Sequence, residues 1–79
     1  MKRTNRETVA RLRLLYIQGT RVELVYMADP YTRLRPGDMG RVEFVDDAAG
    51  IHIAWDNGEG LAAIWGEDII KIVPEEAGA

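Results

Sequence analysis

Two stretches of the sequence indicate its fold class: Leu34-Arg35-Pro36-Gly37-Asp38-Met39-Gly40-Arg41-Val42 and Trp55-Asp56-Asn57-Gly58. A Pro-Gly turn followed by a second glycine and then a strand is typical of small barrels, in which a long loop folds back into the sheet. Asn57-Gly58 predicts a type I′ hairpin turn, because that turn needs positive φ at both central residues. Together they predict an antiparallel sheet rolled into a small barrel.

Apolar side chains alternate with polar ones over five short stretches between residues 20 and 73, which predicts five strands. The side chains expected to face inward from the first three strands are Val22, Leu24, Tyr26, Val42, Phe44, Ile51, Ile53 and Trp55. Residues 60–64 and 69–73 are the fourth and fifth strands, and residues 27–36 form a long loop. This pattern predicts a mainly β fold, a small SH3-like five-stranded antiparallel barrel at residues 19–73.

One N-terminal helix is predicted within residues 1–18, where Thr4-Asn5-Arg6-Glu7 has the form of a capping box and Gly19 ends the helix. The stripe expected to pack on the barrel consists of Val9, Leu12 and Tyr16. A second apolar strip, on the opposite side, consists of Ala10, Leu14 and Ile17. A helix that is apolar on two sides needs a second contact, so this strip predicts a homo-oligomer. Residues 74–79 are expected to be a flexible tail.

The composition is that of one small domain with an uneven charge distribution. The chain has 79 residues, no cysteine and a net charge of -3. Residues 1–21 carry six basic residues and one acidic residue (+5), whereas residues 22–79 carry four basic and twelve acidic residues (-8). A basic arm can bind nucleic acid, but an acidic barrel repels phosphate, so attraction between helix and barrel is favoured. No apolar run is long enough for a membrane span, and the expected location is the cytoplasm.

The sequence supplies little for catalysis. It contains no cysteine or serine nucleophile, and its single histidine, His52, lies within a strand without a second metal-ligating partner at suitable spacing. Its carboxylates at Asp38, Asp46, Asp47 and Asp56 occupy turn positions, where such side chains hydrogen-bond their own backbone. We therefore expect a protein that is not an enzyme and that holds no metal or cofactor.

The sequence contains more residues suited to binding a ligand than to catalysis. These are aromatic and arginine side chains that the fold itself does not require. The candidate ligand-binding residues are Tyr31, Arg33, Arg35, Trp55 and Trp65. Arginine beside exposed aromatic rings can hold an anion while a ring stacks. For Trp55 two interpretations stay open, because it continues an inward strand face and also ends its strand at the barrel rim.

Six short motifs occur along the chain: Gly-Thr-Arg-Val-Glu-Leu at residues 19–24, Met-x-Asp-Pro at 27–30, Pro-Gly-x-x-Gly-x-Val at 36–42, Val-Asp-Asp at 45–47, Ile-His-x-x-Trp-Asp-x-Gly at 51–58 and Gly-Glu-Asp at 66–68. In these motifs the chain resembles a family of small bacterial, phage and mobile-element domains of unknown function. The resemblance implies the barrel fold and a phage-type origin, and no activity. Where such domains commonly have a proline before Gly-Glu-Asp, this chain has Trp65.

Three functions follow from these observations as hypotheses. The first is capture of an anionic, nucleotide-like small molecule, which would sequester a host defence signal. The second is a protein–protein interaction module that uses the rim aromatics or the outer helix strip. The third, nucleic-acid binding by the basic arm, ranks last because the strands carry no basic stripe.

Overall fold

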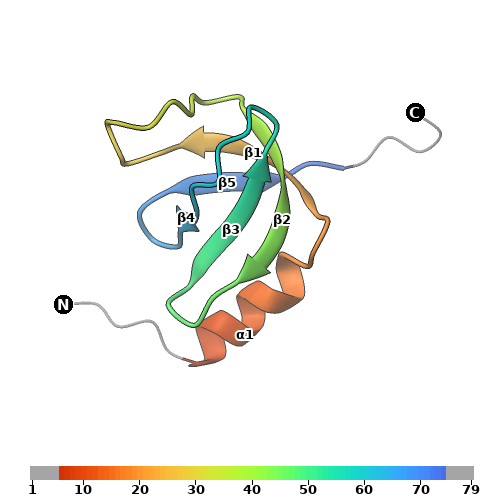
Figure 1. The fold of residues 1–79 in the computed structure, drawn as a ribbon. Coiled ribbons are helices and arrows are strands. Elements are labelled where there is room, and N and C mark those ends of the chain that lie inside the picture. Colours follow the sequence, from red (N-terminus) through yellow and green to blue (C-terminus); the bar gives the residue numbers. More distant parts are fainter. Residues whose placement is uncertain (1–5, 75–79) are drawn as a thin grey trace.

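The computed structural model describes residues 6–74, which form one helix followed by five strands (Figure 1). The elements are α1 (Arg6–Leu15), β1 (Arg21–Tyr26), β2 (Met39–Val45), β3 (Gly50–Trp55), β4 (Ala63–Ile64) and β5 (Ile69–Ile72). The predicted mainly β fold with one N-terminal helix is confirmed. Thr4 of the predicted capping box and most of the predicted tail lie outside the described residues.

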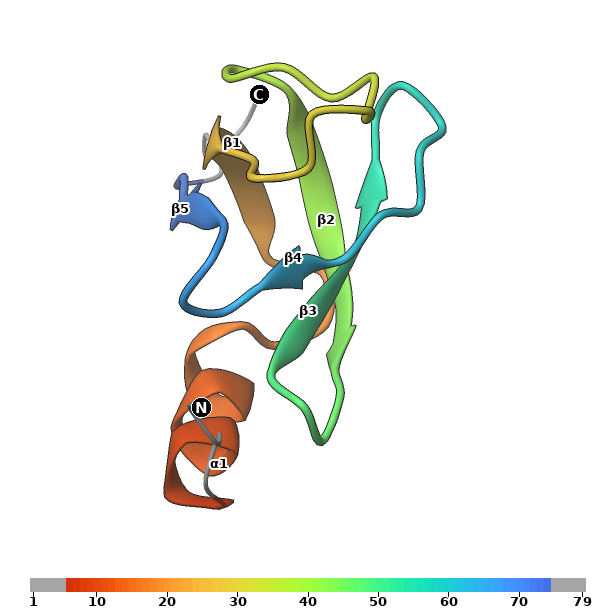
Figure 2. The same cartoon turned by 90° about the vertical axis from the view of Figure 1, so that its left-hand side faces the viewer.

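The five strands form one antiparallel sheet in the order β4-β3-β2-β1-β5. The sheet curls, so that β4 and β5 at its two edges come close to each other, joined by the short turn 65–68 (Figure 2). In the same view, this turn lies next to the C-terminal end of α1. The two edges of the sheet and the end of the helix therefore meet on one side of the molecule.

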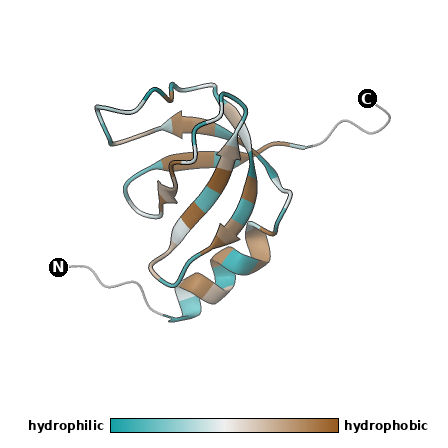
Figure 3. Ribbon diagram, viewed as in Figure 1, coloured by the Kyte–Doolittle hydropathy of each residue, from teal (hydrophilic) through white to brown (hydrophobic). Residues whose placement is uncertain are grey.

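The core lies between the curled sheet and the inner face of α1, and hydrophobic residues recur along β1, β3 and β5 (Figure 3). Its buried members are Val9, Leu12, Val22, Leu24, Leu34, Val42, Val45, Ala49, Ile51, Ile53, Trp55 and Ala63. The predicted helix stripe is confirmed, because Val9 and Leu12 are buried and Tyr16 packs against them. Leu34 brings the long loop into the same core.

Phe44 and Tyr26 are not core residues, so that part of the sequence interpretation is wrong. The pairing of β2 with β3 shifts register between Val42 and Phe44, and the pairing of β1 with β5 shifts between Leu24 and Tyr26. Each irregularity inserts a residue that breaks the period-two alternation. Phe44 is consequently 54% exposed and Val45 is buried in its place.

The turn after β3 also differs from the predicted type I′ geometry. Gly58 N–H donates to the carbonyl of Trp55 at 2.9 Å, which closes a turn with Asp56 and Asn57 at its centre. Among the described residues other than glycine only Ala49 has positive φ, so Asn57 does not. Gly58 itself has φ of +92°. The left-handed residue thus follows the central pair, as in three-residue hairpin loops, and glycine is still what the position favours.

Candidate functional site

An apolar groove of about 450 Å³ opens where the two sheet edges meet the end of α1. We call it the seam groove. The residues that line it are Tyr16, Ile51, Ala63, Ile64, Trp65, Gly66, Asp68, Ile69 and Ile70. They come from the end of the helix, from β3, from both edge strands and from the turn between these. The groove is therefore a product of how the sheet curls.

The seam groove has a floor of core residues and walls of exposed apolar side chains. Ile51 and Ala63 in the floor are buried members of the core. In the walls, Ile64 and Ile69 are exposed and Trp65 is 49% exposed. Large apolar side chains standing beside an opening to the core are typical of surfaces that bind another molecule.

Acidic side chains border the groove. Asp68 lines it and also lines a second hollow of about 330 Å³, together with Asp29 and Glu67. Its two carboxylate oxygens accept the N–H groups of Ala28 and Ile64, each at 2.8 Å. No arginine or lysine is among the residues lining either hollow. The local field therefore opposes an anionic ligand.

The predicted ligand-binding residues are separated within the chain. Trp65 lines the seam groove, whereas Trp55 is 4% exposed and its Nε1–H donates to the carbonyl of Leu61 at 2.8 Å. The interpretation of Trp55 as a core residue is thus the correct one. Tyr31 is 93% exposed, and Arg33 and Arg35 are exposed on the same loop.

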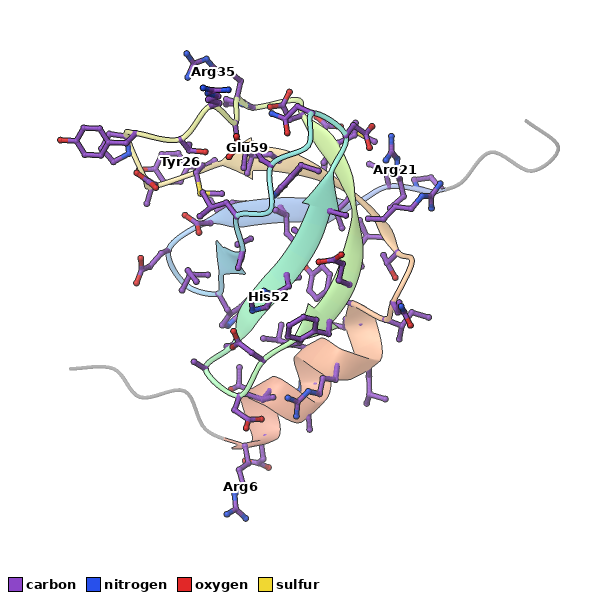
Figure 4. The ribbon with its side chains drawn as sticks, viewed as in Figure 1. Arg6, Arg21, Tyr26, Arg35, His52 and Glu59 are labelled. Atoms are coloured by element: carbon purple, nitrogen blue, oxygen red, sulfur yellow. The ribbon has the colours of Figure 1, made fainter. Side chains whose placement is uncertain are left out.

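The side chains of Tyr31, Arg33 and Arg35 do not line the seam groove. Arg35 projects from the end of the molecule opposite to α1 (Figure 4). Neither hollow is lined by Tyr31, Arg33 or Arg35. One chain therefore does not bring Trp65 together with the loop arginines.

The side of α1 that faces away from the barrel carries the second apolar strip. Ala10 is exposed, and the large side chains Leu14 and Ile17 are 81% and 60% exposed. Val9 and Leu12, on the opposite side of the helix, are buried. The predicted strip is thus present on the surface of the described chain, in a place where it cannot contact its own core.

His52 interacts with Asp46 at the turn between β2 and β3. Its Nε2 lies 2.7 Å from Asp46 Oδ2, and its ring stacks on Phe44 with the centroids 4.2 Å apart. Asp46 Oδ1 accepts the N–H groups of Ala48 and Gly50. These hydrogen bonds, that of Gly50 most of all, together with His52, lower the pKa of Asp46. This geometry supports the interpretation of His52 and Asp46 as structural residues.

The other turn carboxylates also have structural partners. Asp38 accepts the N–H of Arg35, and Asp47 pairs with Arg13. Both Asp56 oxygens accept hydrogen bonds from the Arg21 guanidinium, which lowers the pKa of Asp56. Each carboxylate is thus used within the fold.

The sequence pattern does not predict three of the groove residues, Tyr16, Ile64 and Ile69. One signal was available, because Ile69-Ile70-Lys71-Ile72 is apolar on both faces although it is the last strand of the sheet. Such a strand exposes apolar side chains unless something covers them. The position of Tyr16 beside them depends on how the helix packs, and no local pattern indicates it.

Comparisons with known proteins give a family and no activity. A search of curated proteins and a search of solved structures each returned no match. Within the described residues, no helix is long and apolar enough to cross a membrane. A family model described as a domain of unknown function, DUF4314, matches residues 5–73. The match covers the helix and every strand, and the chain therefore belongs to the DUF4314 family.

Proposed function

We propose that this domain is a non-catalytic protein-interaction module whose seam groove receives apolar side chains of a protein partner. The observation that carries the proposal is the groove itself, with a floor of core residues and the half-exposed ring of Trp65 in its wall. Tryptophan, with tyrosine and arginine, is enriched among the few residues that dominate the energy of protein–protein contacts.

The chemistry of the groove favours a protein segment over a phosphorylated small molecule. Its walls offer aliphatic and aromatic surface, and one carboxylate, that of Asp68, lines it. Asp29 and Glu67 line the adjoining hollow, which shares Ile64 and Asp68 with the groove. A segment with aliphatic or aromatic side chains and a nearby lysine or arginine complements both features. A nucleotide would bring its phosphates against carboxylates.

Capture of an anionic small molecule remains the second candidate, at a different place. Tyr31, Arg33 and Arg35 are exposed on one loop, and within residues 6–74 neither arginine side chain has a hydrogen-bond or ion-pair partner. Two unpaired guanidinium groups near an exposed ring are suited to an anion with an aromatic ring. This candidate does not use the seam groove.

Peptide selection against the immobilised domain tests the first candidate. We expect the selected peptides to be rich in aliphatic, aromatic and basic residues. They should bind Trp65→Glu at least tenfold more weakly than the native chain. Tyr31→Glu is the matched control, because Tyr31 is exposed and lines neither the groove nor the adjoining hollow. Equal binding to the native chain and Trp65→Glu would refute the proposal.

A thermal-shift screen with nucleotides and dinucleotides tests the second candidate. A ligand that binds only the folded state raises the melting temperature. If the loop binds such an anion, the shift should be lost in Arg33→Ala and in Arg35→Ala and kept in Trp65→Glu. No shift with any of these anions would remove the second candidate.

A further inference from the structure

We propose that the occupant of the seam groove is α1 of a second copy of this chain together with the residues that directly follow it, seated through Ala10 and Leu14 of the helix and Ile17 beyond its end. This inference rests on the proposed function and names its partner. The strip and the groove account for five of the eleven large apolar side chains exposed in the described residues: Leu14, Ile17, Ile64, Trp65 and Ile69. The two surfaces have the same chemistry, and neither is covered by the residues that the structure describes.

The strip of one chain cannot fill the groove of that same chain. Val9 and Leu12 hold the inner side of α1 in the core, so the strip on the outer side points away from the barrel. Turning the helix to bring Leu14 inward would expose both of these core residues. Among residues 6–74, no rearrangement of the helix covers the strip while the core stays intact, and a second copy of the chain can do so.

The charges favour a contact between the helix of one copy and the groove of the other over a contact between the two helices. Between residues 6 and 17 the helix segment carries Arg6, Arg11 and Arg13 against Glu7, a net charge of +2. Arg13 is engaged by Asp47 of its own chain, whereas Arg6 and Arg11 have no such partner within residues 6–74. Two such helices side by side repel each other, whereas Asp68 in the seam groove and Asp29 and Glu67 in the adjoining hollow attract the helix.

The spacing of the strip fits a helix lying in a groove. Ala10 and Leu14 are four residues apart on α1, a spacing at which the anchors of groove-bound helices fall on one face, and Ile17 follows two residues beyond the end of the helix. Tyr16, directly before Ile17, lines the groove, so the strip and the groove are neighbours on the surface. Two copies related by a two-fold axis can therefore exchange helices reciprocally, which closes the assembly at a dimer.

Two variants and their mixture test this arrangement by sedimentation velocity at micromolar concentration. Leu14→Asp places a charge on the strip and leaves the groove unchanged. Trp65→Glu places a charge in the groove and leaves the strip unchanged. We expect a dimer for the native chain and at least a tenfold higher dissociation constant for each variant. Circular dichroism and tryptophan fluorescence, which reports Trp55 alone in Trp65→Glu, check that each variant is folded. Tyr31→Glu is the control and should dimerise like the native chain.

The mixture of the two variants provides the sharpest test. Leu14→Asp offers an intact groove and Trp65→Glu an intact helix, so a mixed dimer regains one of the two native contacts. It should therefore form more tightly than either variant alone, although more weakly than the native dimer. A native chain that stays monomeric would overturn this inference, while the peptide selection would still decide the proposed function. Dimerisation abolished by Leu14→Asp but unaffected by Trp65→Glu would also overturn it, because the strip would then contact another surface.

Discussion

One carboxylate, that of Asp68, fixes three segments of the chain. One of its oxygens accepts the N–H of Ala28, where the long loop begins, and the other accepts the N–H of Ile64 in β4. Asp68 itself immediately precedes β5. The turn that forms one wall of the seam groove is thus tied to both of its neighbours. The geometry of the groove depends on this side chain as much as on the apolar residues.

Asp68→Ala should therefore lower the free energy of unfolding by about 1–3 kcal/mol, because two backbone N–H groups lose a charged acceptor. Urea unfolding measures the change. Glu67→Ala is the matched control, since the neighbouring Glu67 side chain is exposed and makes no hydrogen bond or ion pair within residues 6–74. Equal losses in the two variants would show that Asp68 does not hold these segments together.

A second carboxylate, Asp46, should make stability depend on pH. Its pKa in the folded chain is lowered from an ordinary value of 3.8, so its contribution is present above that value and is lost as the pH falls through the folded pKa. Asp56 acts in the same direction. Urea unfolding between about pH 3 and pH 6 should show stability falling below about pH 4. The fall should be smaller in Asp46→Asn, and an unchanged profile would contradict this role.

At the level of elements, β2 and β3 approach so closely at Gly40 that no side chain fits between them. A Cβ at this position would lie 2.5 Å from Ile53 Cγ2 and 2.9 Å from the carbonyl oxygen of Ala54. The second of these is backbone, so the strands themselves would have to separate. This contact fixes the spacing of the central pair of the sheet.

Gly40→Ala should consequently cost about 1–3 kcal/mol, in the range of other overpacked sites. Gly60→Ala is the matched control, because nothing lies within 4 Å of a Cβ there and its φ is not in the left-handed region. Thermal unfolding should show a clearly lower melting temperature for Gly40→Ala alone. Similar melting temperatures would mean that β2 and β3 can move apart at little cost.

At the scale of the whole molecule, helix and sheet share one core, so they should unfold together. Leu12→Ala should destabilise the chain by about 2–5 kcal/mol, because Leu12 is fully buried among strand residues. Leu14→Ala, two residues away and exposed, should change stability by no more than about 0.5 kcal/mol in the monomer.

Two probes follow this transition independently. Far-UV circular dichroism reports the helix and, in a Trp65→Phe background, fluorescence reports Trp55, which is then the only tryptophan. Both signals should change at the same urea concentration, as expected for one cooperative unit. A helix signal lost at lower urea than the Trp55 signal would contradict a shared core.

Local pattern was enough to predict the elements and most of the residues that face the core. Alternation in β1 and β3 and the helical spacing of Val9, Leu12 and Tyr16 indicate the buried faces, because side-chain direction follows directly from backbone repeat. The turn role of Asp46 and the positive φ of Gly58 are equally local, since both depend on residues within a short turn. The exposure of Ala10 and Leu14 follows from the same helical repeat, whereas Ile17 lies beyond the end of α1.

The candidate site depends on contacts between segments that are distant in sequence. The register shifts that expose Phe44 and Tyr26 arise between paired strands, so the alternation within either strand does not reveal them. The seam groove exists because the sheet curls until β4 and β5 meet beside Tyr16. The same curl separates Trp65 from Arg33 and Arg35. Local sequence sets which way a side chain faces, and only long-range packing sets which side chains stand together.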